Sequence, residues 1–290
     1  MDTILDKIKN NFIDYDEIIK TSVVDILYPI GEYDINVVVP VRNRLGFLAP
    51  LLKSLSRADK AGLSIEVTVV EHDRVSRHRH TALMHGVNYI FIQAEGAFNK
   101  CEAFNVGVIV APKSKYIVLH DLDCMVQKNF FLGILENMKA KKTEAVQSYY
   151  NRSPVYCDHI LTPDIICGNI DVNELHIGSP HTFVGSGKAP GGSITITREL
   201  FFRIGGFDAE LFTGYAPEDQ FFWDKMAFYT RVGECDEPMV NVFHLCHELT
   251  LNTNPKLKDM IKVTGRFEEL DRDMQECIIE YKRNLLVKYA

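Results

Sequence analysis

The sequence reads Tyr116-Ile-Val-Leu-His-Asp-Leu-Asp-Cys124 in its first half. The apolar run Tyr116–His120 is typical of a strand buried in a sheet, and two aspartates follow directly at its end. In an extended chain, residues i and i+2 project to the same side, so we expect Asp121 and Asp123 to face one ligand. Two carboxylates this close repel each other unless a cation lies beside them, and a divalent ion with a bound diphosphate is the natural partner. The stretch therefore favours a metal site over a solvated turn.

Strands and helices alternate on either side of this stretch. We expect further strands at 35–39, 65–70, 89–92, 191–197 and 239–245, and helices near 45–55, 81–86, 101–110, 199–204, 218–229 and 265–288. Such alternation predicts the α/β class, with a mostly parallel, Rossmann-like sheet that has helices on both faces and ligands beyond the carboxyl ends of its strands. We divide the chain into a helical N-terminal extension (1–33), a catalytic domain (34–250) and a helical C-terminal extension (251–290). Residues 145–190 are expected to be irregular.

The composition excludes several classes of protein. The formal net charge is −7, from 32 basic and 39 acidic residues, so a binder of nucleic acid is not expected. Seven cysteines are scattered without a Cys-x-x-Cys pair, which indicates reduced thiols rather than a zinc ribbon. No apolar run approaches the roughly 18 residues of a membrane span. We therefore expect a cytoplasmic protein, with peripheral membrane association left open and a surface for homo-oligomers on the helical extensions.

Three more polar motifs follow predicted strands or begin a predicted helix. Arg42 and Arg44 come after the first strand, where guanidinium groups either bind phosphate or carboxylate or remain solvated. His244 and His247 are spaced to coordinate one metal, or are two histidines that bond to the backbone. Glu218-Asp219 opens a helix, where the helix dipole lowers the pKa of a carboxylate and keeps it ionised. Taken one at a time, these motifs leave a functional and a purely structural interpretation open.

Taken together and in this order, the motifs resemble those of the β-1,4-galactosyltransferase family. They also resemble the related chondroitin polymerases and polypeptide N-acetylgalactosaminyltransferases, which share the GT-A fold of nucleotide-diphospho-sugar transferases. The resemblance covers about residues 35–250. The matching segments are Val39-Pro-Val-Arg-Asn-Arg44, Phe98-Asn-Lys-Cys-Glu-Ala-Phe-Asn-Val-Gly107, His120-Asp-Leu-Asp-Cys124, Gly191-Gly192, Gly214-Tyr-Ala-Pro-Glu-Asp219 and His244-Leu-Cys-His247.

The resemblance implies an inverting, metal-dependent transferase that moves a hexose or N-acetylhexosamine from a UDP-sugar to a hydroxyl of a saccharide or glycoconjugate. It implies that Mn²⁺, or Mg²⁺, is held by Asp123, His244 and His247. Asp219 would be the general base, with Glu218 beside it. The residues that the resemblance implies for nucleotide and donor binding are Pro40, Val41, Arg42, Arg44, Glu71, Asp121, Gly191 and Gly192.

Several positions depart from the family pattern. Tyr215, Ala216 and Pro217 stand where the family has Trp-Gly-Gly, and Gln220 replaces an acid. These positions serve the acceptor in the family, so the acceptor is left open. Ala189 lies near a position where a bulky family residue crowds the C2 substituent of the donor, which favours an N-acetylhexosamine donor.

Two other functions compete with the transferase hypothesis. A sugar-nucleotide pyrophosphorylase requires a glycine- and lysine-rich loop after the first strand, and Val41–Arg44 does not supply one. A non-catalytic carbohydrate-binding protein on a GT-A scaffold has no need of the acids and histidines of the site, yet Asp121, Asp123, Asp219 and His247 are all present. The transferase is therefore the preferred hypothesis.

Overall fold

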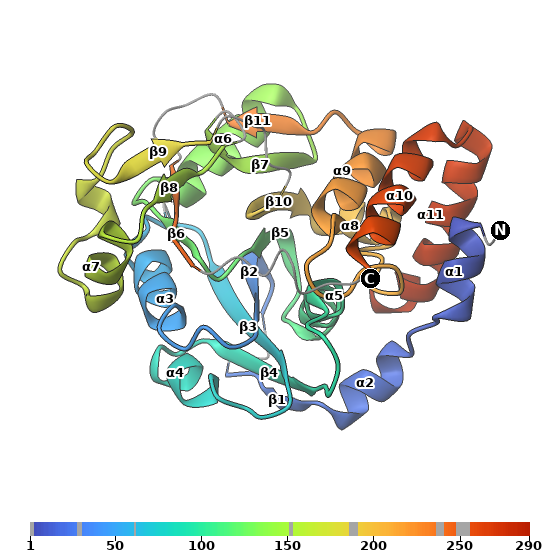
Figure 1. Ribbon diagram of the computed structural model, residues 1–290, viewed down its shortest axis with the longest axis horizontal. Helices are drawn as coiled ribbons and strands as arrows, with labels where there is room; N and C mark the ends of the chain where they lie inside the picture. Colours follow the sequence, from blue (N-terminus) through green and yellow to red (C-terminus); the bar gives the residue numbers. More distant parts are fainter. Residues whose placement is uncertain are drawn as a thin grey trace.

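The computed structural model describes residues 3–27, 31–60, 62–150, 153–185, 191–235, 241–247 and 256–290. These residues form two β-sheets, and helices pack on both faces of the larger one (Figure 1). The larger sheet has eight strands in the order β1-β4-β3-β2-β5-β10-β7-β11. Its strands are β1 (Val23–Asp25), β2 (Tyr33–Val41), β3 (Ile65–Asp73), β4 (Asn88–Gln93), β5 (Ser114–His120), β7 (Ala145–Tyr150), β10 (Ser193–Thr197) and β11 (Gly233–Cys235).

The central strands of this sheet run parallel. Strands β4, β3, β2 and β5 are all mutually parallel, as are β7 and β11. The pairs β1–β4, β5–β10 and β7–β10 are antiparallel. The α/β class and the Rossmann-like, mostly parallel sheet are confirmed.

Strand β2 lies near the middle of the sheet because its residues are apolar on both faces. Val37, Val38 and Val39 are fully buried. Val38 packs in one core together with helix α5 (Lys100–Val110), while Val37 and Val39 pack in a second core together with helix α3 (Leu48–Arg57). An unbroken β-branched run is the pattern of a strand covered on both faces. The valine run therefore places β2 in the interior of the sheet, with its carboxyl end at Val41.

The smaller sheet has the order β6-β12-β8-β9. It comprises β6 (Cys124–Val126), β12 (Val242–His244), β8 (Val155–Cys157) and β9 (Thr182–Val184). The expectation that residues 145–190 are irregular is wrong in part, since β7, β8, β9, helix α7 (Leu161–Cys167) and the 3₁₀ turn η1 (Val172–Glu174) lie there. Three-residue strands are too short to show an alternating pattern. The strand expected at 239–245 is confirmed for Val242–His244, while residues 239 and 240 lie outside the described ranges.

The N-terminal and C-terminal extensions differ in detail from the sequence prediction. The other helices are α1 (Ile4–Asn10), α2 (Tyr15–Thr21), α4 (Arg79–Met84), α6 (Phe130–Lys141), α8 (Arg198–Arg203), α9 (Glu218–Tyr229), α10 (Leu257–Glu269), α11 (Arg272–Leu286) and the 3₁₀ turn η2 (Val287–Tyr289). Residues 23–25 are the edge strand β1 and not helix, because they pair with β4. The single helix expected at 265–288 is two helices, and the side chain of Asp271 caps the second by accepting from the N–H of Met274.

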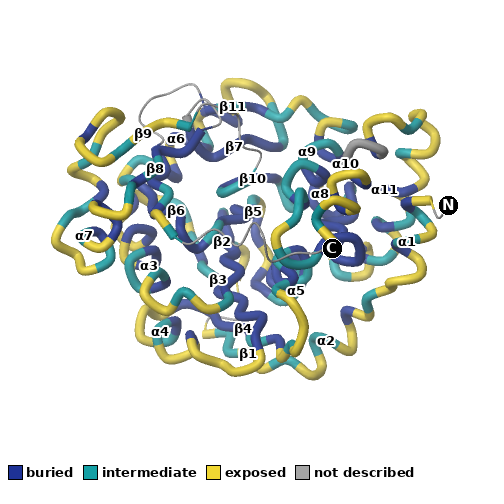
Figure 2. Tube along the Cα trace, viewed as in Figure 1, coloured by how far each residue is buried: buried dark blue, intermediate teal, exposed yellow. Residues whose placement is uncertain are grey.

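The C-terminal helices pack against the body of the protein beside α8 and α9 (Figure 1). Phe267, Ile278 and Leu286 belong to the same core as Phe221 and Phe222 of α9. Figure 2 shows buried residues on the facing sides of these helices and on the strands of the larger sheet. The helices that follow residue 256 therefore complete the core around α9.

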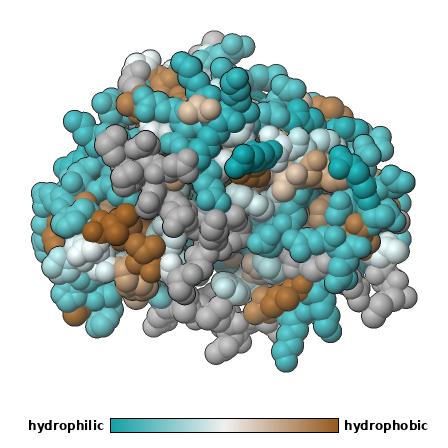
Figure 3. All heavy atoms as spheres, turned by 90° about the horizontal axis from the view of Figure 1, so that it is seen from above, coloured by the Kyte–Doolittle hydropathy of each residue, from teal (hydrophilic) through white to brown (hydrophobic). Residues whose placement is uncertain are grey.

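The face seen from above in Figure 3 is mostly hydrophilic, with separate apolar patches. Single exposed apolar residues are normal on a folded protein. Among the residues that the structure describes, no helix combines the length and the apolar character that crossing a membrane requires.

Candidate active site

Three side chains of metal-ligand type converge where β5 and β12 end. Asp123 follows β5, His244 is the last residue of β12, and His247 lies three residues further on. One ligand atom from each residue lies within 4.8 Å of the other two. His247 Nε2 is 3.0 Å from Asp123 Oδ2, and His244 Nε2 is 3.6 Å from Asp123 Oδ1. One carboxylate and two imidazoles are a donor set that suits a single divalent transition-metal ion.

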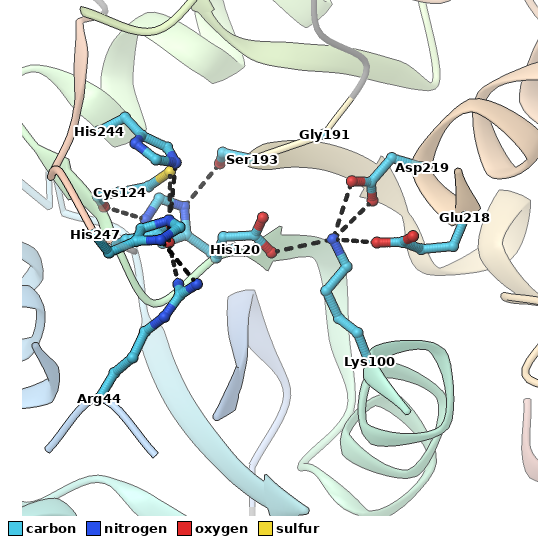
Figure 4. Close-up of polar contacts among 12 residues, drawn as sticks. Arg44, Lys100, His120, Cys124, Gly191, Ser193, Glu218, Asp219, His244 and His247 are labelled. Carbon is cyan, nitrogen blue, oxygen red and sulfur yellow. Dashed lines mark hydrogen bonds and ion pairs between the residues drawn. The ribbon is translucent and has the colours of Figure 1, made fainter. Parts of the chain in front are cut away.

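Arg44 also reaches this cluster. Its Nη1 donates to Asp123 Oδ2, and its Nη2 lies 3.2 Å from His247 Nδ1 (Figure 4). Burial opposes the ionisation of Asp123, but the hydrogen bond with His247 and the charges of His244 and Arg44 hold the pKa of Asp123 below its usual range. Asn43 and Arg44 have φ values of 56° and 51°, in the left-handed region that non-glycine residues rarely adopt. Such backbone strain is concentrated at functional sites in proteins.

The segment from Asp121 to Asp123 forms a turn. The N–H of Cys124 donates to Asp121 O at 3.2 Å. Asp123 therefore reaches the histidines, while Asp121 Oδ1 lies 3.5 Å from Lys100 Nζ. The extended geometry expected for Asp121–Asp123 is wrong, because the chain turns directly after β5 and the two carboxylates lie beside different neighbours.

The buried side chain of His120 stabilises this turn through two hydrogen bonds. Its Nδ1 lies 2.8 Å from Ser193 Oγ, and its Nε2 lies 2.6 Å from the carbonyl oxygen of Cys124. Burial lowers the pKa of His120 to about 4, so the ring is neutral at physiological pH. The ring thus links the end of β5 to the start of β6 and to β10.

A second cluster forms around the side chain of Lys100. Lys100 Nζ lies 2.7 Å from Glu218 Oε1, 2.9 Å from Asp219 Oδ2 and 3.5 Å from Asp121 Oδ1 (Figure 4). Burial opposes the positive charge of Lys100, but the three carboxylates raise its pKa well above the ordinary value. Only one residue, Leu122, separates the two clusters along the chain. The two clusters therefore lie next to each other in space, and together they form one candidate site that extends from His247 to Asp219.

Sequence analysis assigned no role to Lys100, although the residue lies in a matching segment. Lys100 is the first residue of α5, and a cation is unfavourable at a helix N-terminus. A lysine in that position indicates a carboxylate partner that compensates it. The partners Glu218 and Asp219 are more than a hundred residues away in the sequence, so this signal does not identify them.

Two acids of the second cluster have raised pKa values, although the helix dipole is expected to lower the pKa at the start of α9. Burial raises the pKa of Glu218 to about 7, against the opposing effect of Lys100 and with a further rise from Asp219. Burial likewise raises the pKa of Asp121 to about 6. The prediction that the dipole of α9 keeps the pKa low is thus wrong for Glu218, because burial outweighs the dipole. One acid of the predicted catalytic pair binds a proton near neutral pH.

The two glycines before β10 lie against these acids. A Cβ added at Gly191 would stand 2.0 Å from Asp219 Oδ2, so only glycine fits there without a shift of Asp219. Gly192 has φ 86°, and its carbonyl oxygen accepts from the N–H of Asp121 at 2.8 Å. Gly191 and Gly192 therefore bring β10 into contact with Asp121 and Asp219. The predicted donor-selecting residue Ala189 lies outside the described residues.

The ends of β2 and β3 form a polar region beside the clusters. Arg42 donates from Nη1 to Gly96 O at 2.7 Å, and its Nε lies 3.6 Å from Asp73 Oδ1. His72 lies 3.4 Å from Glu102 Oε1, and its ring centroid lies 5.9 Å from that of Phe98. Asp73 is the last residue of β3 and lies three residues beyond the strand expected at 65–70, and it is not one of the predicted site residues. The two pairs, Arg42 with Asp73 and His72 with Phe98, bring charged and aromatic side chains to the end of β3.

Three other predicted nucleotide contacts are placed differently. Pro40 and Val41 are buried within β2. The carboxylate of Glu71 is fully buried and accepts from the N–H groups of Arg77 and His78 at 3.0 Å and from the hydroxyl of Tyr89. Glu71 therefore fixes the loop after β3, and its acceptor capacity is used within the protein.

The raised pKa of Glu218 predicts how the Glu218→Gln variant responds to pH. The folded protein binds this proton more tightly than the unfolded chain, whose ordinary pKa is 4.5. The stability that this proton contributes is therefore fully present below about pH 4.5 and is lost as the pH rises through about 7. Glu218→Gln should raise the melting temperature at pH 8 relative to the parent, and much less at pH 4.5, in thermal unfolding with a chelator present. Exposed Glu199→Gln is the control, and the same shift at both pH values for Glu218→Gln would contradict the argument.

Comparisons with known proteins agree in fold only. No protein-family model and no curated protein matches this sequence. Among solved structures, GalNAc-T7 with UDP, GalNAc and Mn²⁺ has a TM-score of 0.55 and 13% identity, over 89% of this chain and 55% of that chain. TarS 1–349 of S. aureus in complex with UDP-GlcNAc has a TM-score of 0.53 and 14% identity, over 89% of this chain and 73% of that chain.

A third structure is glucosyl-3-phosphoglycerate synthase from Mycobacterium tuberculosis, in complex with Mn²⁺, UDP and phosphoglyceric acid. It has a TM-score of 0.53 and 14% identity, over 80% of this chain and 77% of that chain. This chain thus spans about half of the length of the GalNAc-T7 chain and about three quarters of the other two. At such low identity the likeness establishes the fold, and the chain has the fold of the GT-A glycosyltransferases.

Proposed function

We propose that this protein is an inverting, Mn²⁺-dependent glycosyltransferase that uses a UDP-sugar donor and a saccharide or glycoconjugate acceptor. The observation that carries the proposal is the pairing of two different charged clusters on either side of Leu122. One cluster offers ligands for a cation, and the other holds two adjacent acids at the start of α9. A metal-assisted, inverting transfer from a sugar diphosphate uses a cation beside the diphosphate and a base beside the sugar.

The metal cluster fits Mn²⁺ through its donor set. Asp123, His244 and His247 would hold the ion, and mixed oxygen and imidazole ligation suits Mn²⁺ better than Mg²⁺. A bound divalent ion supplies charge that stabilises the diphosphate as it leaves. Arg44, which already bonds Asp123 and His247, adds a second positive charge on the same side. Two of the similar structures contain Mn²⁺ together with UDP, which supports this proposal.

The nucleoside end of the donor would lie at the ends of β2 and β3. Arg42 and Asp73 supply a donor and an acceptor there, and both side chains are largely buried. Phe98 beside His72 supplies a ring face for packing against a base. From this region the diphosphate would extend to Arg44 and Asp123, and the sugar would extend to Asp121 and Gly191. The close approach of Gly191 to Asp219 supports a sugar-binding turn next to the acid pair.

Asp219 is the proposed general base. It would accept the proton of the acceptor hydroxyl while that oxygen attacks the anomeric carbon in a single displacement, which inverts the configuration. Lys100 bonds both Asp219 oxygens, at 3.1 and 2.9 Å, and so orients the carboxylate. Glu218, whose pKa is about 7, is suited to hydrogen bonding with sugar hydroxyls in either protonation state. Positioning of the two substrates would account for a large part of the rate.

The metal assignment predicts that Asp123→Asn abolishes the dependence of UDP binding on Mn²⁺. The parent should bind UDP at least tenfold more tightly with Mn²⁺ than in excess chelator, whereas Asp123→Asn should bind equally in both conditions. Isothermal titration calorimetry measures this directly. The matched control is Asp158→Asn, which removes the acid of an exposed aspartate–histidine pair, Asp158 with His181. Equal affinity of the parent with and without Mn²⁺ would exclude the proposed metal site.

The base assignment predicts that Asp219→Asn lowers turnover by about two to four orders of magnitude. Asparagine keeps the shape of the side chain but cannot accept the proton, and the metal cluster is untouched, so UDP affinity should stay within about twofold of the parent. Release of UDP from a panel of UDP-hexoses and UDP-N-acetylhexosamines, with Mn²⁺ and water or sugar acceptors, measures the rate. Asp224→Asn, on the same helix, is the control. Near-parental turnover in Asp219→Asn would exclude Asp219 as the base.

A further inference from the structure

The loop between α8 and α9 leads directly into the proposed catalytic pair and is held by two buried ion pairs. Lys282 Nζ lies 2.7 and 2.6 Å from the two carboxylate oxygens of Glu210, and neither side chain is exposed. Lys225 Nζ lies 2.5 Å from Asp208 Oδ2 and donates to Gly206 O at 2.6 Å. These two ion pairs hold the segment 208–210 in place. The first comes from α11, near the C-terminus, and the second from α9 itself.

Helix α11 also packs directly on the backbone of this loop. Gly205 and Gly206 have φ values of 74° and 58°, in the left-handed region. A Cβ at Gly205 would lie 2.5 Å from Lys282 Cβ, and one at Gly206 would lie 2.9 Å from Leu286 Cδ1. The loop and α11 therefore fit together without room for side chains at these two positions. The C-terminal helix determines where the loop runs.

A short series of contacts connects this anchor to Asp219. Ala209, next to Glu210, accepts through its carbonyl oxygen from Asn99 Nδ2 at 2.9 Å. Asn99 directly precedes Lys100, which holds Asp219. The N–H of Gly214 donates to the carbonyl oxygen of Phe98 at 2.7 Å, so the loop is held to the same segment at a second point. The anchor on α11 and the ammonium that orients the base are thereby parts of one connected structure.

Stability alone is a poor explanation for the ion pair between Lys282 and Glu210. Burying two charges costs several kcal/mol per ion, and replacing such a pair with neutral residues of similar volume is often neutral or stabilising. A buried pair does, however, fix the relative position of the two elements that carry it, since neither charge can be left unpaired. The geometry of the pair is specific to α11 and the loop. A role in placing the loop accounts for its presence.

We infer that Lys282 is a positioning residue of the active site, which acts through Glu210 and the 205–217 loop on Asp219. The inference rests on the proposed function for its effect on catalysis. The C-terminal helix α11 then contributes to the position of the catalytic base, although it lies outside the site. Its loss or displacement leaves the metal cluster in place and moves the base.

The test is the double variant Glu210→Met/Lys282→Met, which removes both charges, leaves no buried polar group without a partner and retains most of the side-chain volume. Its melting temperature should be no lower than that of the parent, because no unpaired charge is left. UDP affinity with Mn²⁺ should stay within twofold, because Asp123, His244 and His247 are not touched. UDP release from a saturating UDP-sugar should fall by about ten- to a hundredfold, since a displacement of the order of 1 Å has such an effect. The matched control is Asp16→Asn/Lys288→Met, which removes an exposed ion pair near the same C-terminus.

A second variant, Asn99→Asp, and a second measurement, amide hydrogen exchange, test the same connection independently. Asn99→Asp keeps the oxygen that caps α5 but removes the amide that reaches Ala209, so it should show the same loss of rate with unchanged UDP affinity. Amide hydrogen exchange in residues 212–220 should become at least tenfold faster in both variants, and not in the control. UDP release within twofold of the control, with unchanged exchange in this segment, would overturn the inference. If the parent itself releases no UDP, the proposed function fails, and the exchange result alone decides whether Lys282 positions the loop.

Discussion

The ammonium group of Lys100 is bonded to carboxylates from two distant parts of the chain, and the arrangement of the site depends on that contact. Asp121 comes from the end of β5, and Glu218 and Asp219 come from the start of α9. Three acids, of which Glu218 is buried and Asp121 and Asp219 are partly buried, repel one another and lose hydration, and Lys100 compensates both costs. Lys100 thereby joins α5, β5 and α9 at one point. The loop before α9 and the glycines before β10 are shaped around that point.

The charge in the site is divided in a way that suits a donor with two chemically different ends. Arg44 and the two histidines surround Asp123, so that side attracts an anion once a cation is bound. On the other side of Leu122, three acids share one lysine, which suits hydroxyl groups better than phosphate. A sugar diphosphate that spans both sides would place its scissile bond between them. The same division explains why burial raises the pKa of Glu218 whereas the neighbouring cations hold down that of Asp123.

The elements that could be predicted from the sequence are those with a strong local pattern. Strands β2, β4 and β5 are predicted because each contains a continuous apolar run, and β3 because its apolar residues are interrupted only by Glu66 and Thr68 within 65–70. Helix α9 is predicted because acids begin it. The bend after His120 could not be predicted, since an extended chain and a turn place the same residues one after the other. Asp271, a helix-capping residue within a helical pattern, is the local signal in the sequence for the break between α10 and α11.

The composition of the site was only partly predictable for a different reason. The spacing within Asp121–Asp123 and within His244–His247 is local, so the ligand types could be identified, and the structure brings Asp123, His244 and His247 together. The contact of Lys100 with Asp219 and that of Lys282 with Glu210 join residues that are 72 or more positions apart. No periodicity or spacing in the sequence indicates such pairs. They depend on the way the terminal helices and the loop before α9 pack on the sheet.

The central claim is that Asp123, His244 and His247 hold a divalent ion that binds the diphosphate of a UDP-sugar. Anomalous diffraction from crystals grown with Mn²⁺ and UDP, collected on both sides of the manganese absorption edge, tests it most directly. The account predicts one strong anomalous peak within coordination distance of all three side chains, with diphosphate oxygens in the same coordination shell. A peak at another position, or UDP bound with no peak beside Asp123, would contradict the account.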